Sequence, residues 1–114
     1  MRKIILTVIP LLFSGASAHA HAFLDHANPR VGSTVRTAPR EVTLSFTQKL
    51  EPSFSSAQVT DASGARVDQG AQVSGMTIHV PVRTLSPGTY RVRWHVLSVD
   101  THKTEGSFTF RVGQ

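Results

Sequence analysis

Apolar and polar residues alternate along most of the chain after residue 21, and this period of two limits the possible folds more than any other feature. In one segment, for example, Val42, Leu44 and Phe46 are separated by Thr43 and Ser45. Successive side chains of a strand point to opposite faces, so the pattern predicts strands with one face on a core. Helical periodicity is hard to find over the same region. We therefore expect an all-β fold.

Turn signals divide the alternating region into about seven antiparallel strands. Examples are Asn28-Pro29 and Ser86-Pro87-Gly88. Short strands at this spacing are typical of an immunoglobulin-like, Greek-key β-sandwich. The expected strands lie near 22–27, 41–47, 56–61, 65–73, 76–81, 88–98 and 105–112. The expected core anchors are Phe46, Tyr90, Trp94, Phe108 and Phe110.

The first twenty residues do not fit that sandwich. Arg2 and Lys3 form a basic start, residues 4–13 are mostly apolar, and alanine recurs at positions 16, 18 and 20. This three-part arrangement is typical of a secretory signal peptide. The apolar run is about half the ~20 residues that a membrane span needs. We expect residues 1–20 to be a cleaved signal peptide and residues 21–114 to form one domain.

Cleavage after either Ala18 or Ala20 leaves a histidine at the new N-terminus, namely His19 or His21. The α-amine and the imidazole of one such residue can chelate a metal ion as a pair. If His19 were retained, the segment His19-Ala20-His21 would form a different copper(II) chelate, with backbone nitrogens and the imidazole at its third position. The residues alone leave both cleavage points open.

Composition excludes several other functions. The chain has no cysteine, so it has neither disulfides nor a thiolate metal site or nucleophile, and an ordinary core must stabilise it. The net charge is +5, but the arginines are scattered and Arg2 and Lys3 belong to the predicted signal peptide. An exported chain with dispersed charge is a poor candidate for nucleic-acid binding.

A second candidate for metal chemistry is Asp100-Thr101-His102, just after the longest alternating segment. On extended backbone, residues two apart point to the same side, so Asp100 and His102 are expected to face one ion together. With the amine and imidazole of an N-terminal His21, they supply three nitrogens and one oxygen. Such a set in a plane suits Cu(II) best, and Met76 is the only sulfur left for Cu(I).

Several segments of the chain match a known family in their order and spacing. The matching segments are His21-Ala22-Phe23-Leu24 with Asn28-Pro29 and Gly32-Ser33, Leu44-Ser45-Phe46-Thr47, Leu85 through Trp94, Ser98-Val99-Asp100-Thr101-His102, Gly106, and Phe108-Thr109-Phe110. On these segments, the mature chain resembles the CopC family of periplasmic copper-resistance proteins.

The resemblance implies a site and a role. It implies that one Cu(II) ion is bound by the amine and imidazole of His21, by Asp100 and by His102, and it favours cleavage after Ala20. It also implies a periplasmic carrier or buffer in copper homeostasis and resistance. An inner-membrane CopD-type copper protein is the expected partner.

The sequence departs from the family pattern in two places. Some members carry a methionine-rich Cu(I) loop in mid-domain, but residues 50–56 contain no methionine, as in the members that bind only Cu(II). Some members have a glutamate near the copper where this chain has Gln48. A weak axial contact from Gln48, from Glu51 or from water stays open. The histidines His26, His79 and His95 lack a chelating neighbour and are expected to be structural or surface residues.

Two other functions compete with copper carriage. A copper-dependent oxidative enzyme is one, because lytic polysaccharide monooxygenases also chelate copper with an N-terminal histidine on a similar sandwich. Asp100 as an anionic ligand favours Cu(II), and the chain has few aromatic residues for a polysaccharide platform, so we expect no enzyme activity. The other is a metal-free immunoglobulin-like interaction module, which a metal titration would distinguish.

Overall fold

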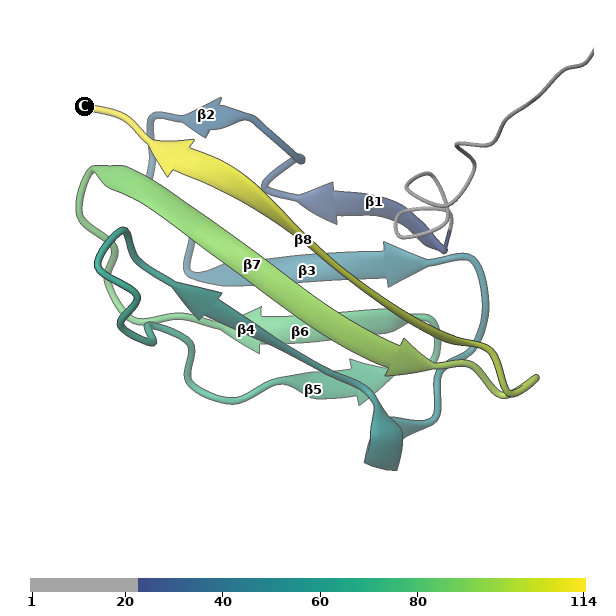
Figure 1. The fold of residues 1–114 in the computed structure, drawn as a ribbon. Helices are drawn as coiled ribbons and strands as arrows, with labels where there is room; N and C mark the ends of the chain where they lie inside the picture. Colours follow the sequence, from purple (N-terminus) through teal and green to yellow (C-terminus); the bar gives the residue numbers. More distant parts are fainter. Residues whose placement is uncertain (1–22) are drawn as a thin grey trace, which may run out of the picture.

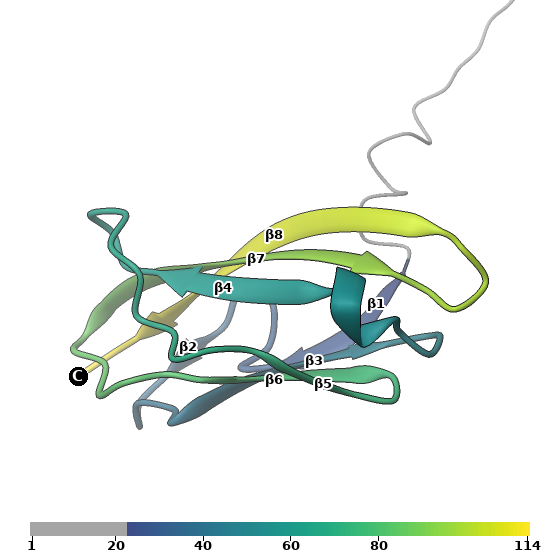
Figure 2. The same cartoon turned by 90° about the horizontal axis from the view of Figure 1, so that it is seen from below.

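The computed structural model describes residues 23–114, which form two facing sheets of four strands each (Figures 1 and 2). The first sheet has the order β1-β3-β6-β5, with β1 at Leu24–Asn28, β3 at Glu41–Phe46, β6 at Thr77–Pro81 and β5 at Gln72–Ser74. The second has the order β2-β8-β7-β4, with β2 at Thr34–Val35, β8 at Lys103–Val112, β7 at Gly88–Leu97 and β4 at Ser56–Thr60. A single 3-10 turn, η1 at Pro52–Phe54, precedes β4.

The inward faces of the two sheets form one apolar core, because β3, β4, β6 and β7 alternate buried residues with more exposed ones, as expected. All five predicted anchors are buried, and Phe110 has no exposed surface. The rings of Trp94 and Phe46 form a T-shaped pair with 5.2 Å between their centroids, and the rings of Phe46 and Phe23 lie with centroids 5.6 Å apart. This aromatic row connects the two sheets near the point where the described chain begins.

The longest pairing in the molecule joins β7 to β8. It runs without interruption from Gly88 opposite Val112 to Leu97 opposite Lys103. The two strands extend together to the end of the sandwich where the turn of residues 98–102 connects them (Figure 1). The position of that turn is therefore determined by a continuous antiparallel ladder.

Six of the seven expected strands are present, with ends within two residues of the prediction. The strand expected at 65–73 is wrong: only β5 and isolated bridges at Arg66 and Asp68 occur there. Arg66 pairs with Thr60 in the second sheet whereas Asp68 pairs with Val82 beside the first, so this segment crosses between the sheets and cannot form one ladder.

One strand was missed. β2 has two residues, too few for an alternating pattern, and it pairs in parallel with β8, so the sandwich is not purely antiparallel. Among the described residues, no helix is long and apolar enough to cross a membrane.

The crossing segment is held by the carboxylate of Asp68, whose side chain is only 2% exposed. It accepts hydrogen bonds from Arg66 Nε and Nη2 at 2.8 Å each and from the Val59 backbone N–H at 2.9 Å. The hydrogen bond from Arg66, followed by that from Val59, lowers the pKa of Asp68 below its usual value.

We expect Asp68→Asn to lower the free energy of unfolding at pH 7 by about 1.5–3 kcal/mol, because hydrogen bonds to a charged group are lost. The pKa of Asp68 is depressed in the folded state. The contribution of the ionised carboxylate to the free energy of unfolding is therefore complete above the unfolded-state pKa of about 3.9. It is lost as the pH falls through the lower folded-state pKa.

Urea unfolding at several pH values checks this, with the exposed Asp25→Asn as the control. The stability difference between wild type and Asp68→Asn should be largest near neutrality and should shrink in acid. A difference that stayed constant down to pH 2 would contradict a role for the ionised carboxylate.

Candidate metal centre

Three segments that are distant in sequence meet at one end of the sandwich: the start of β1, the residues after β3, and the turn between β7 and β8 (Figure 1). The backbone N–H of Thr47 donates to the carbonyl of Phe23 at 3.1 Å, and the Thr47 hydroxyl donates to the same oxygen at 3.4 Å. The N–H of Val99 donates to the carbonyl of Lys49 at 3.0 Å. Residues 47–49 thus connect the beginning of the described chain to the turn.

The turn of residues 98–102 is tight rather than extended. Ser98 N–H donates to the carbonyl of His102 at 2.9 Å, and Thr101 N–H donates to the carbonyl of Ser98 at 2.9 Å. Thr101 has φ 72°, an unusual value for a β-branched residue. The expectation that Asp100 and His102 would lie on extended backbone is therefore wrong; a left-handed residue between them turns the chain instead.

The hydroxyl of Ser98 organises this turn. Ser98 is fully buried, and its Oγ donates a short hydrogen bond to Asp100 Oδ1 while accepting the backbone N–H of His102 at 3.2 Å. The hydrogen bond from Ser98 lowers the pKa of Asp100, and the neighbouring His102 ring acts in the same direction. Asp100 is therefore an ionised acceptor at neutral pH.

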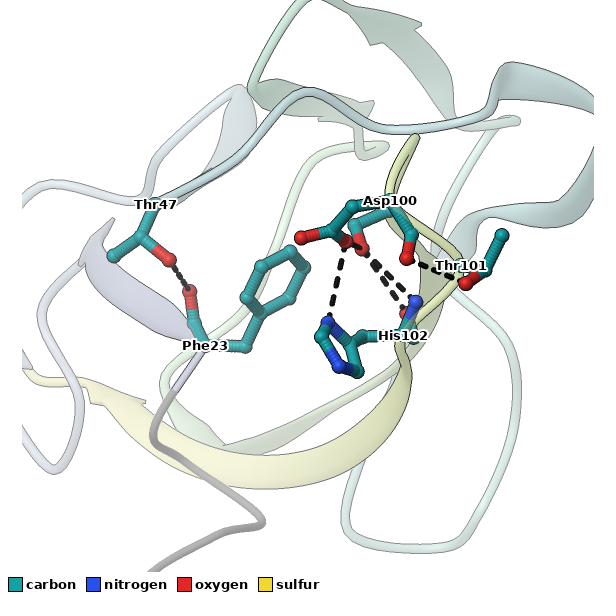
Figure 3. A network of polar contacts seen from close by, with 6 residues as sticks. Phe23, Thr47, Asp100, Thr101 and His102 are labelled. Atoms are coloured by element: carbon teal, nitrogen blue, oxygen red, sulfur yellow. Dashed lines mark hydrogen bonds and ion pairs between the residues drawn. The ribbon is translucent and has the colours of Figure 1, made fainter.

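The turn brings the side chains of Asp100 and His102 together, as Figure 3 shows. His102 Nδ1 lies 3.3 Å from Asp100 Oδ1. Both side chains are open to solvent, with 75% of His102 and 45% of Asp100 exposed. Within residues 23–114, no group of three histidine, aspartate or glutamate side chains converges on one point, so this pair is at most part of a metal site.

The third predicted ligand, His21, lies outside the described residues. The described chain begins two residues later, at Phe23, whose carbonyl is held by Thr47 beside the turn (Figure 3). Neither the predicted signal peptide nor its cleavage point falls within the described part of the chain.

Gln48 contacts the site through Asp100. When its amide nitrogen faces the carboxylate, Gln48 donates to Asp100 Oδ2 at 2.6 Å and to Oδ1 at 3.1 Å. An ionised carboxylate only accepts hydrogen bonds, so this is the orientation that satisfies both groups. Of the two candidates for an axial contact, Gln48 therefore lies against the expected ligand Asp100.

The three other histidines of the described residues lie elsewhere. His26 Nδ1 lies 2.8 Å from the carboxylate of Asp25, and His79 Nδ1 lies 3.5 Å from that of Glu41. His95 is exposed on β7, opposite Glu105 of β8. None of the three is part of the Asp100 and His102 pair.

Sequence reasoning did not identify Ser98. The available signal was a small hydroxyl residue two positions before an aspartate at the end of a strand, where serine side chains often bond the backbone of a turn. Its complete burial, which makes the hydroxyl hold the turn, is visible only in the fold.

We expect Ser98→Ala to lower the free energy of unfolding by about 1–3 kcal/mol, because the backbone N–H of His102 and the carboxylate of Asp100 each lose a hydrogen-bond partner. Thermal or urea unfolding of the metal-free protein measures this. Ser74→Ala, at an exposed serine of β5, is the control and should change stability by less than about 0.5 kcal/mol. Equal stability of the two variants would mean that the hydroxyl does not hold the turn.

Comparison with known proteins gives the chain a family. Residues 24–113 match the model of the CopC domain. Protein YobA of Escherichia coli K12 is 39% identical over 101 residues, covering 84% of this chain and 82% of that protein. Copper resistance protein C of Xanthomonas campestris pv. juglandis is 37% identical over 124 residues, covering 97% and 96%.

The fold has a solved relative as well. The crystal structure of CopC from Methylosinus trichosporium OB3b superimposes with a TM-score of 0.75 at 33% identity, covering 82% of this chain and 94% of that one. Family model, sequence relatives and fold agree over nearly all of the described sandwich, and the chain belongs to the CopC domain family.

Proposed function

We propose that this protein binds one Cu(II) ion as cargo, through the α-amine and imidazole of His21 together with Asp100 and His102. In this proposal residues 1–20 are a signal peptide, cleavage after Ala20 frees His21, and the protein acts in the periplasm. It serves as a carrier or buffer in copper homeostasis and resistance rather than as an enzyme. The copper-resistance names of its relatives support the choice of metal.

The observation that carries the proposal is the spacing of the Asp100 and His102 pair. Two ligand atoms bound side by side to one first-row ion, each with a bond of about 2.0–2.2 Å, lie about 3 Å apart. Asp100 Oδ1 and His102 Nδ1 are separated by 3.3 Å. A small rotation of either side chain would therefore allow both atoms to coordinate the same ion.

Chain length supports the participation of His21. Phe23 is tied to Thr47, beside Gln48, whose amide contacts Asp100. Two residues of extended chain span at most about 7 Å, so His21 stays close to Phe23 and Thr47, which supports its proposed participation in the site. They supply the two donors that the described residues lack for a four-ligand site.

The donor chemistry favours Cu(II) over other ions. The proposed set has three nitrogens and one carboxylate oxygen, which suits the tetragonal plane of Cu(II), and Cu(II) has the highest affinity of the divalent first-row ions for such sites. The lowered pKa of Asp100 means that its carboxylate needs no deprotonation before it binds metal near neutral pH. Proton competition therefore comes from the nitrogen donors.

The exposure of the pair supports a carrier role. His102 is 75% exposed, and the turn that holds it lies at the end of the sandwich and not in its core. A partner protein can approach an ion held there without any opening of the fold. A CopD-type membrane copper protein is the partner we propose.

Blocking the chelate at His21 should weaken Cu(II) binding by orders of magnitude. The test compares a chain that begins at His21 with one that carries Gly-Ser-Gly-Ser ahead of it, by competition against a Cu(II) chelator of known affinity. The extension leaves the fold intact but moves the α-amine away from the imidazole. If the two chains bind Cu(II) equally well, the amine is not a ligand.

Substitutions should separate ligands from bystanders. His102→Ala and Asp100→Ala should each weaken Cu(II) binding and change the electron paramagnetic resonance spectrum, with the larger loss for His102 because nitrogen is the better Cu(II) donor. His79→Ala is the matched control, since His79 also lies beside a carboxylate, at 3.5 Å, but on the other sheet. An unaltered spectrum in His102→Ala would remove that residue from the site.

A further inference from the structure

Asp100 is held from two sides by residues that are not proposed ligands. Ser98 donates to Oδ1 from the buried side of the turn, and the amide of Gln48 donates to Oδ2 at 2.6 Å and to Oδ1 at 3.1 Å from the segment after β3. Both carboxylate oxygens therefore already accept hydrogen bonds before any metal arrives. The orientation of the carboxylate is fixed by its neighbours, although 45% of its surface is exposed.

The contact from Gln48 is itself well supported by the backbone. On one side of Gln48, the backbone N–H of Thr47 donates a hydrogen bond to the carbonyl of Phe23. On the other side, the carbonyl of Lys49 accepts a hydrogen bond from the backbone N–H of Val99 at 3.0 Å. Leu50, two residues further, forms a bridge with Ser98. Gln48 is therefore held between two anchored residues, and it is half-buried.

A carboxylate has about four lone-pair directions, two on each oxygen. Ser98 and Gln48 occupy directions on Oδ1, and Gln48 occupies one on Oδ2. An ion bound to Oδ1, the oxygen that lies 3.3 Å from His102 Nδ1, replaces only the longer Gln48 contact of 3.1 Å and leaves the 2.6 Å contact to Oδ2 in place. The Gln48 nitrogen contacts both oxygens, so an ion bound by both at once would have to displace Gln48 altogether. The arrangement favours one-oxygen binding in a fixed direction.

We propose that Gln48 is a positioning residue of the metal site: it orients Asp100 for one-oxygen coordination and is not itself an axial ligand. This inference rests on the proposed function, because it assumes that Asp100 binds the ion. The physical benefit is preorganisation, since a ligand already held in its bound orientation loses less freedom when the metal arrives. Partners of this kind commonly contribute a factor of about 10–100 to metal affinity.

The main experiment is a double-mutant cycle on Cu(II) affinity with Gln48→Leu and Asp100→Ala. Leucine keeps much of the volume of glutamine but has no donor. Gln48→Leu alone should weaken Cu(II) binding by about 10- to 100-fold and shift the paramagnetic resonance spectrum. In the Asp100→Ala background it should have no further effect, because Gln48 acts only through that carboxylate.

The matched control is Gln58→Leu, at a half-buried glutamine of β4 that contributes to another face of the molecule. It should leave Cu(II) affinity and spectrum at their wild-type values. Melting of the metal-free variants checks that each is folded. A second readout needs no metal: the side-chain amide protons of Gln48 should exchange more slowly than those of Gln58, and Asp100→Ala should abolish the difference.

The outcomes are distinguishable. If Gln48→Leu weakens binding equally in the presence and absence of Asp100, Gln48 is a direct ligand and the positioning role is wrong. If Gln48→Leu matches wild type in affinity and spectrum while His102→Ala loses copper, the positioning role is wrong but the proposed function stands. If His102→Ala and Asp100→Ala also bind copper as wild type does, the proposed site itself is overturned.

Discussion

The uninterrupted pairing of β7 with β8 is the constraint on which the candidate site depends. Ten residues of each strand pair from Gly88 opposite Val112 to Leu97 opposite Lys103. One face of both strands is buried against the other sheet, so a shift of β7 by one residue would expose Trp94 and a shift of β8 would expose Phe110. The core thereby fixes where the turn of residues 98–102 begins and ends, and with it the positions of Asp100 and His102.

Ser98 is the point where the core ends and the site begins. It is a buried polar residue at the end of a strand whose preceding inward positions are apolar. Its hydroxyl hydrogen-bonds both the carboxylate of Asp100 and the backbone N–H of His102. A residue fixed in the core thereby orders an exposed turn. The turn thus keeps a defined shape without apolar packing of its own.

Alternation in the sequence was sufficient to predict the sandwich, its anchors and most of its strands, because a half-buried strand repeats every two residues whatever its partners are. The alternation pattern failed for segments that do not form a regular, half-buried strand. The segment around Arg66 and Asp68 has strand-like residues but changes sheets, and β2 is too short to repeat. Both depend on contacts with distant residues, which a local pattern does not contain.

The site was predictable in part. The sequence singled out Asp100 and His102, and the structure brings them together, but through a left-handed Thr101 rather than the expected extended backbone. The contacts from Ser98 and Gln48 were beyond sequence reasoning about ligands. Ser98 looks like an ordinary strand-end serine until the fold shows that it is buried. Gln48 is distant in sequence from Asp100, so only the meeting of two loops reveals their contact.

The exposure of His102 has a consequence for kinetics. If His102 binds the ion as proposed, its ring is 75% open to solvent, and an incoming donor can displace it while the remaining ligands still hold the ion. In that proposal, transfer to another protein proceeds by stepwise exchange of ligands, and its rate depends on the concentration of the acceptor instead of on spontaneous dissociation. Tight binding and rapid delivery are compatible at such a rim, whereas an ion enclosed in the core would have to wait for the sandwich to open.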